Sequence, residues 1–219
     1  MSKANSQEED PYSHEHYAGF PDGFFDRADS TNDNNFYVEP RMVTHIDDRA
    51  IGAVGDLYRE LKITGRVLDL MSSWVSHFVE VPEELVVLGM NKEELTSNSQ
   101  ASSWCQHDLN LDPHLPFDDN YFDAVVCCVS VDYLVRPLEV FAEVYRIVRK
   151  GGLFVNSFSN RCFPTKAIRG WGQTDDQGHV SIVGEYYRRT GPWADLHTEL
   201  RTPLGEPGDP LYAVWGHGA

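Results

Sequence analysis

The sequence predicts an α/β fold built on one doubly wound, mostly parallel sheet with helices on both faces. Near-continuous apolar runs occupy 66–71, 85–89, 122–129 and 152–157, and such runs are typical of parallel strands that are covered on both sides. Helical patterns alternate with these runs, which favours an α/β arrangement over separate helical and sheet layers. A chain of 219 residues is long enough to bury the core of one such domain.

The first predicted element is a helix over 47–61. Ile51, Val54 and Leu57 recur at helical spacing, and the carboxylate of Asp47 or Asp48 can accept hydrogen bonds from the first turn. This helix is expected to lie against the sheet that follows.

Two more helices are predicted at 92–98 and 137–149, the second with an apolar stripe along one face. The pattern loosens into an aromatic and polar stretch at 163–193, and a last strand is expected at 210–216.

The N-terminal part, 1–35, is rich in Ser, Asn, Asp and Glu, a composition that does not support an independent fold. We therefore expect a flexible acidic segment at 1–35 and one domain at 36–219. Isolated aromatic residues in the segment raise the alternative of a lid over the site. They are Tyr12, Tyr17, Phe20, Phe24 and Phe25.

Composition excludes several partners and compartments. The formal charge of −16 disfavours nucleic acid and anionic membrane surfaces, which bind through Lys and Arg. No run approaches the length of a membrane span, and the first residues do not resemble a targeting peptide. Cys105, Cys127, Cys128 and Cys162 contain no C-x-x-C pair, which indicates a reduced, cytoplasmic protein without structural zinc. No feature predicts an oligomeric state.

The strand ends carry the most specific sequence pattern. Asp69 is followed by the turn 71–77, and later come Gln106-His107-Asp108-Leu109, Leu115-Pro116-Phe117 and the segment 135–153 with its Lys150-Gly151-Gly152 turn. In order and spacing, roughly 45–160 resembles the class I S-adenosylmethionine-dependent methyltransferases, specifically the small-molecule group labelled type 11. The resemblance implies a Rossmann-like, seven-stranded sheet, S-adenosylmethionine as cofactor, and a small-molecule substrate.

The turn after Asp69 departs from the family pattern. Met71, Ser73 and Val75 stand where the family has glycines, which allow positive φ and close approach of backbone N–H groups to a ligand. The hydroxyls of Ser72, Ser73 and Ser76 offer a compensating way to hold the methionine carboxylate. The resemblance thus assigns Asp69, Met71, Ser72 and Ser73 to the cofactor, while the lost glycines raise the alternative of a catalytically inactive binding or regulatory protein.

Four more residues are assigned to the cofactor by the resemblance. Asn91 stands where the family has an acid that binds the ribose, and an amide lacks the charge that strengthens such bonds. Asp108 is expected to accept from the adenine amino group while Leu109 packs on the ring, with a turn-capping role as the alternative for Asp108. Ser130 lies where the family faces the methyl group.

Asp132 and Tyr133 are the predicted catalytic pair, as a base or orienting group, although Asp132 can instead cap the following helix. Substrate contacts are expected in the N-terminal approach to the sheet and after the fourth apolar run, at Phe36, Tyr37, Arg41, His45, Asn160, Arg161, Phe163, Trp171, Tyr186 and Tyr187. His45, His77 and His107 lack short ligand spacing, so no metal is expected. A nicotinamide-dependent oxidoreductase is disfavoured because no G-x-G-x-x-G follows the first strand.

Overall fold

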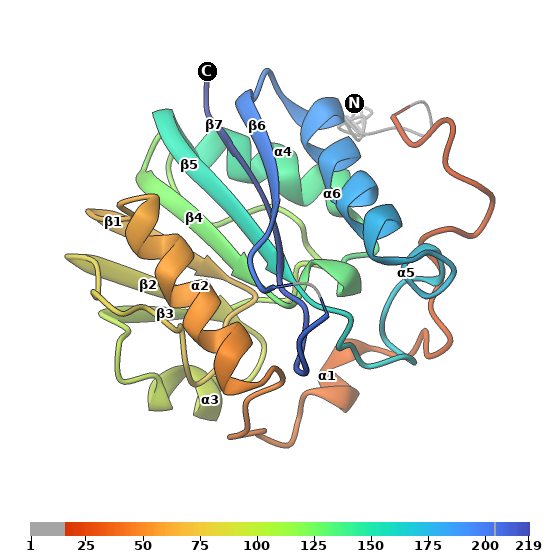
Figure 1. Cartoon of the computed structure of the whole chain (residues 1–219), viewed down its shortest axis with the longest axis horizontal. Helices are drawn as coiled ribbons and strands as arrows, with labels where there is room; N and C mark the ends of the chain where they lie inside the picture. Colours follow the sequence, from red (N-terminus) through yellow and green to blue (C-terminus); the bar gives the residue numbers. More distant parts are fainter. Residues whose placement is uncertain (1–15, 204) are drawn as a thin grey trace, which may run out of the picture.

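The computed structural model describes residues 16–203 and 205–219. One seven-stranded sheet with the strand order β3-β2-β1-β4-β5-β7-β6 runs through the molecule (Figure 1). Strands β1 to β5 are parallel, β7 is antiparallel to β5, and β6 is antiparallel to β7. The predicted mostly parallel, seven-stranded sheet is confirmed. The strands are β1 (Arg66–Leu70), β2 (Glu84–Gly89), β3 (Ser103–Gln106), β4 (Phe122–Cys128), β5 (Val148–Phe158), β6 (Ala194–Leu200) and β7 (Tyr212–His217).

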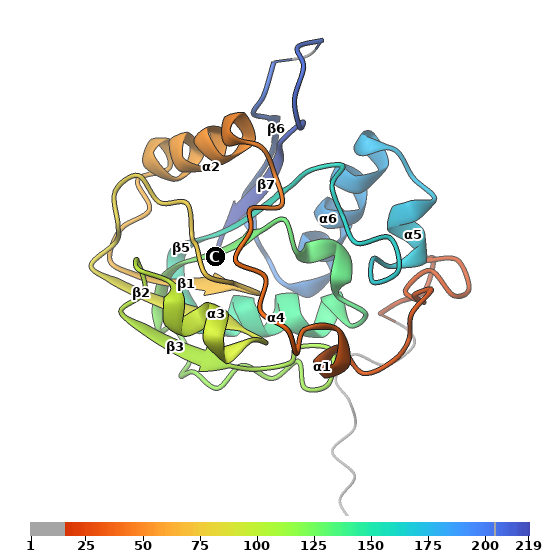
Figure 2. The ribbon, with the colours of Figure 1, turned by 90° about the horizontal axis from the view of Figure 1, so that it is seen from below.

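Helices cover both faces of the sheet. Figure 2 shows α2 on one side and α4 with α6 on the other. Short helices lie near the strand ends, among them a 3-10 turn, η1, directly after β4. The helices are α1 (Asp33–Phe36), α2 (Asp48–Glu60), α3 (Lys92–Ser97), η1 (Val131–Tyr133), α4 (Pro137–Ile147), α5 (Arg169–Gly172) and α6 (Asp176–Thr190).

Each face of the sheet has its own buried cluster. Val67 packs with Val54 and Leu57 of α2, whereas its neighbour Leu68 packs on the face that α4 and α6 cover. Successive side chains of a strand point to opposite faces, so a strand buried on both sides must be apolar throughout. This explains the continuous apolar runs in the sequence.

The connection from β1 to β2, residues 71–83, contains no helix. Instead, the Phe78 ring packs on Tyr58 of α2 with 4.7 Å between centroids. The Gln100 side chain fixes this loop, because its amide donates to the Phe78 carbonyl at 2.7 Å and its carbonyl accepts from the Phe78 N–H at 3.2 Å. The first parallel crossover is therefore an extended loop that an amide side chain holds in place.

The described part of the N-terminal segment packs beside the sheet. The Tyr17 hydroxyl donates to Glu139 of α4, and the rings of Phe20 and Phe25 each lie 6.3 Å from that of Tyr186 in α6. These contacts put the N-terminal aromatic residues against α4 and α6. Flexibility of 1–35 stays a prediction, and residues 1–15, with Tyr12, lie outside the described part. No described helix has the length and apolar character of a bilayer span.

Candidate functional site

A cavity of about 390 Å³ opens at the carboxyl ends of the central strands. It lies where the strand order reverses between β1 and β4, the usual ligand position in open α/β sheets. Residues 26–46, which we call the strap, contribute a further wall, and Figure 2 shows the segment between α1 and α2 crossing in front of this sheet edge. The predicted cofactor residues Asp69, Met71, Ser72, Ser73, Asn91, Asp108, Leu109 and Ser130 all line this cavity.

The loop after β1 keeps a glycine-like conformation without glycine. Met71 has a φ of 57°, the left-handed region that a side chain disfavours. The Ser72 N–H donates to the Leu88 carbonyl at 2.7 Å, and a Cβ on Gly89 would collide with the Ser72 carbonyl. Contact with β2 thus sets the path of the turn, and Met71 adopts positive φ as a consequence.

Asp69 lies at the base of this loop. Its side chain is buried and accepts a hydrogen bond from the Ser72 hydroxyl at 2.7 Å. Burial raises the pKa of the Asp69 carboxyl to about 7, against the lowering effect of hydrogen bonds from Ser76 and Ser72. Asp69 therefore positions the loop through Ser72 and Ser76.

The serine hydroxyls of the loop have protein partners. Ser73 Oγ donates to Glu94 Oε2 at 2.6 Å, and Ser76 Oγ accepts from Asn98 Nδ2 at 2.7 Å. By contrast, the backbone N–H groups of 73–76 donate to no acceptor in the described chain. The groups of this loop that remain available to an anion are its main-chain donors.

Asn91 acts as a structural connector. Its carbonyl caps α3 by accepting from the N–H groups of Glu93 and Glu94, at 2.9 and 3.1 Å. Its amide donates to the carbonyls of Tyr37 and Val38 in the strap, at 2.9 and 3.1 Å. Both polar atoms of Asn91 are thus used to join α3 to the strap.

Glu94 is a cavity residue that sequence reasoning missed. It is 8% exposed, and its carboxylate accepts from Ser73 Oγ and, at 2.7 Å, from the Arg41 N–H. The spacing Asn91-x-x-Glu94 is that of a capping box, in which the acid reaches back to its own helix. In the structure this carboxylate instead links the β1 loop to the strap and faces the cavity.

The turn after β3 provides Asp108 and Leu109. Asp108 Oδ1 accepts from the N–H groups of Asn110 and Leu111, at 3.0 and 3.2 Å, so the turn-capping interpretation holds for this oxygen. Leu109 is buried and lines the cavity together with Met90 from the end of β2.

The segment after β4 carries the predicted catalytic residues. Ser130 Oγ donates to the Cys128 carbonyl at 3.0 Å, and Tyr133 Oη accepts from the Phe163 N–H at 2.9 Å. Tyr133 lines the cavity, whereas Asp132 does not. Asp132 is 2% exposed, and its Oδ2 has no hydrogen-bond partner among the described residues. Burial raises the pKa of this carboxyl to about 8.

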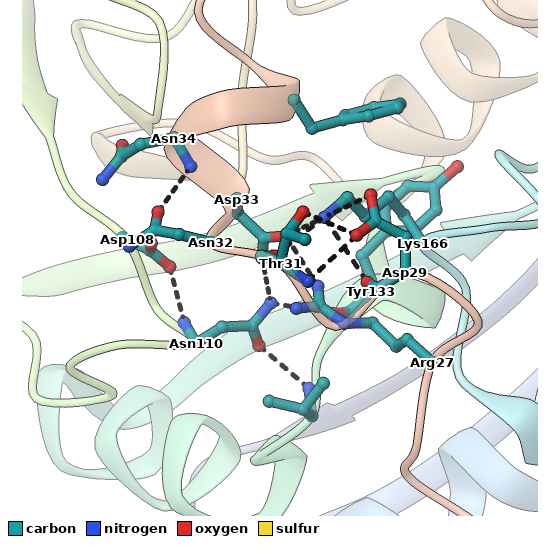
Figure 3. Close-up of polar contacts among 12 residues, drawn as sticks. Arg27, Asp29, Thr31, Asn32, Asp33, Asn34, Asp108, Asn110, Tyr133 and Lys166 are labelled. Carbon is teal, nitrogen blue, oxygen red and sulfur yellow. Dashed lines mark hydrogen bonds and ion pairs between the residues drawn. The ribbon is translucent and has the colours of Figure 1, made fainter.

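Buried charges anchor the strap (Figure 3). Both carboxylate oxygens of Asp33 accept from Arg27 Nη1 at 2.8 Å, and Lys166 Nζ lies 3.0 Å from Asp33 and 3.1 Å from Asp29. Asn110 Nδ2 donates to Asp33 at 2.9 Å. The strap is therefore tied both to the turn after β3 and to the segment after β5. Sequence spacing gave no signal for this cluster, because its members lie far apart in the chain.

The predicted substrate residues divide between cavity and core. Tyr37, Arg41, His45, Asn160, Arg161 and Phe163 line the cavity, whereas Trp171, Tyr186 and Tyr187 are core residues. Phe36 packs edge-on against Phe163 at 5.2 Å. Burial lowers the pKa of His45, so this imidazole is neutral near pH 7. In the described residues no three His, Cys, Asp or Glu side chains group as a metal site.

The fold and the position of the cavity define a class I methyltransferase architecture. Residues 64–156 match a family model described as a methyltransferase domain.

Among curated proteins, the ubiquinone/menaquinone biosynthesis C-methyltransferase of Roseobacter denitrificans is 31% identical over 129 residues, 56% of this chain and 46% of that protein. The bifunctional biotin biosynthesis protein BioHC of Teredinibacter turnerae is 25% identical over 105 residues, 48% of this chain and 18% of that protein. The match thus spans less than half of either relative.

Solved structures show the same fold at low identity. A Thermotoga maritima protein described as a possible histamine N-methyltransferase superposes with a TM-score of 0.56 at 13% identity, over 78% of this chain and 89% of that one. The [4+2]-cyclase SpnF superposes with a TM-score of 0.57 at 12% identity, over 84% and 90%. Because one of these neighbours is named for a cyclisation, the shared fold alone does not define a reaction.

Proposed function

We propose that the protein is an S-adenosylmethionine-dependent methyltransferase that acts on a small molecule. The observation that carries the proposal is the cavity, which joins the β1 loop, the end of β2 and the turn after β3 in one space. These are three of the places that the family resemblance assigns to the cofactor. The strap leaves a limited volume beside them, which suits a small acceptor.

The residues present fit this cofactor. The N–H groups of 73–76, which lack protein acceptors, suit a methionine carboxylate. Glu94 supplies the carboxylate for the ribose hydroxyls that Asn91 lacks, while Met90 and Leu109 form apolar sides for the adenine. Asp108 uses Oδ1 in its turn, which leaves Oδ2 for the adenine amino group.

Bound S-adenosylmethionine supplies an electrophilic methyl group, and the protein contributes mainly alignment of the acceptor for in-line displacement. Tyr133 accepts from the Phe163 N–H, which leaves its own hydroxyl proton to donate to Asp132 or to a ligand. Burial raises the Tyr133 pKa, which makes this phenol an orienting donor. Neutral His45, which also lines the cavity, is the proposed proton acceptor. Asp132 is buried and does not line the cavity. Its role is to influence the neighbouring Tyr133 hydroxyl.

Calorimetric titration with S-adenosylmethionine and S-adenosylhomocysteine tests the proposal. We expect micromolar binding that Asp108→Ala weakens at least tenfold. Asp112→Ala, which removes an exposed carboxylate four residues away, is the matched control and should bind as the unchanged protein does. Absence of binding heat in a folded protein would refute the cofactor site.

A second candidate is a methyltransferase-fold binding protein without catalysis. The specific observation in its favour is that both polar atoms of Asn91 are consumed by α3 and the strap. This candidate predicts that the cavity binds a small molecule while neither S-adenosylmethionine nor S-adenosylhomocysteine raises the melting temperature. Stabilisation by both nucleosides would exclude it in favour of the methyltransferase.

A further inference from the structure

Arg41 is a cavity residue whose guanidinium forms no ion pair within residues 16–203 and 205–219. Its Nη2 donates to the Phe36 carbonyl at 2.8 Å, while its buried Nη1 has no hydrogen-bond partner in the described chain. Arg41 is hydrogen-bonded to the acid Glu94, but the Glu94 carboxylate accepts from the Arg41 backbone N–H and not from its guanidinium. A guanidinium shielded from water without a carboxylate is costly to bury.

Aromatic rings fix the position of this guanidinium. Its central carbon lies 4.4 Å from the Phe36 ring centroid and 5.6 Å from those of Tyr37 and Phe163. Cation–π contact stabilises the charge and restricts its movement, so the side chain is preorganised before any ligand arrives.

Among the described residues, the carboxylates that line the cavity form no ion pair or hydrogen bond with the Arg41 guanidinium; they are Asp33, Asp69, Glu94 and Asp108. Arg161, the other arginine of the cavity, is 63% exposed and lies 3.8 Å from Asp209. Burial lowers the pKa of His45, on which the charges of Glu94 and Arg41 act in opposite directions. The imidazole is therefore uncharged near pH 7. In a chain with a formal charge of −16, a cation held in a cavity without an acidic partner among the described residues indicates an anionic ligand.

We propose that Arg41 binds a carboxylate of the methyl acceptor, which is then a small acid with a planar, aromatic or unsaturated body. The inference rests on the proposed function. The cofactor carboxylate has its own donors in the loop 73–76, whereas Arg41 packs on Phe163, in the segment after β5. A planar fork of N–H donors matches a carboxylate, and the rings of Tyr37, Tyr133 and Phe163 suit a flat ligand body.

Two ligand pairs test the proposal. Benzoate against benzamide, and phenylacetate against phenylacetamide, differ in charge and little in shape. They are titrated by ligand-observed NMR with and without saturating S-adenosylhomocysteine. The unchanged protein should prefer each acid at least tenfold. Arg41→Gln should abolish that preference, and Arg41→Lys should restore part of it.

Arg189→Gln is the matched control. Arg189 also stacks on a ring, Phe20 at 4.6 Å, and donates to main-chain carbonyls of the N-terminal segment, but it lies on α6 away from the cavity. Arg189→Gln should leave the preference for the acids over the amides unchanged. Melting curves of each variant separate lost binding from lost folding.

A further titration distinguishes a carboxylate of the acceptor from the amino-acid carboxylate of the cofactor as the ligand of Arg41. S-adenosylhomocysteine and 5′-methylthioadenosine, which lacks the amino-acid carboxylate, are titrated into the unchanged protein and Arg41→Gln. The proposal predicts the same affinity ratio in both proteins. A ratio that collapses in Arg41→Gln, or equal binding of acids and amides by the unchanged protein, would overturn it. Failure of both nucleosides to bind would instead refute the proposed function, since the acids are also titrated alone.

Discussion

Lys166 Nζ lies 3.0 Å from the Asp33 carboxylate, and both side chains are almost completely withdrawn from water, at 0% and 3% exposure. The pair joins the strap to the segment that follows β5. Lys166 also donates to the main-chain carbonyl of Thr31 at 3.0 Å. The N-terminal wall of the cavity is therefore anchored by a buried ion pair.

Lys166→Met is expected to lower the free energy of unfolding by about 3–5 kcal/mol, the usual cost of removing one partner of a buried pair. In this variant Asp29 loses its cationic partner, and Arg27 is the cation that remains bound to Asp33. Urea denaturation measures the effect. Arg59→Met, which removes an ion pair about half exposed on both sides, should cost less than about 1 kcal/mol. Equal effects of the two variants would contradict the anchoring role.

Position 71 should prefer glycine to alanine. Because φ is 57° there, Met71→Gly is expected to be about 1 kcal/mol more stable than Met71→Ala. Ser73 does not have positive φ, so Ser73→Ala should be more stable than Ser73→Gly by about 0.4–1 kcal/mol. Urea midpoints of the four variants give both differences. If glycine and alanine ranked in the same order of stability at positions 71 and 73, the turn would not require the left-handed conformation.

Asp132 should make the protein less stable as the pH rises. Its pKa is about 8 in the folded chain against 3.8 as the ordinary value. Between about pH 4 and pH 8 the unfolded carboxyl has lost its proton while the folded one retains it, so the free energy of unfolding falls across this window. Asp69 acts in the same direction up to about pH 7.

Asp132→Asn is therefore expected to reduce the slope of stability against pH and to gain most above pH 7, as measured by urea denaturation from pH 5 to pH 9. Asp56→Asn, at an exposed site on α2, should retain the original slope. An Asp132→Asn slope equal to that of the unchanged protein would show that this carboxyl is ionised in the folded state.

Glu94→Gln should weaken S-adenosylhomocysteine binding about tenfold, since it removes a charged acceptor from the proposed ribose position. The change also leaves either Ser73 Oγ or the Arg41 N–H facing an amide donor. Glu93→Gln, one residue earlier and exposed on the same helix, is the control for calorimetry. Unchanged affinity in Glu94→Gln would remove this carboxylate from the cofactor site.

The sequence predicted the strands that are apolar throughout and the helices that have a single apolar stripe. The apolar runs that became β1, β2, β4 and β5 are buried on both faces, and α2 and α4 each have one apolar stripe. The strand expected at 210–216 is confirmed as β7 (Tyr212–His217). Strand β6 was missed because most of its side chains are exposed. Helix α6 was missed because its buried residues, among them the adjacent Tyr186 and Tyr187, are interspersed with glycines and charged residues.

The candidate site was less predictable, since long-range contacts decide which polar atoms remain free. Spacing placed Asn91, Asp108 and Tyr133 at the cavity, but it could not show that Asn91 is consumed by the strap. It also could not show that Glu94 turns away from its own helix, or that Asp132 points into the interior. The first two outcomes depend on contacts with the strap, of which only residues 26–35 belong to the segment that was expected to be flexible.

Beyond its side-chain anchor at Asp29 and Asp33, the strap is attached to the rest of the chain largely through its own main-chain atoms from Tyr37 onward. The carbonyls of Tyr37 and Val38 bind Asn91, the Val43 carbonyl accepts from Trp74, and the Arg41 N–H binds Glu94. Attachments of this kind do not depend on which side chains the strap carries. Its cavity-facing positions after Asp33 can therefore be exchanged without detaching it, so new acceptor preferences can be selected or engineered there while the sheet and its cofactor loops stay constant.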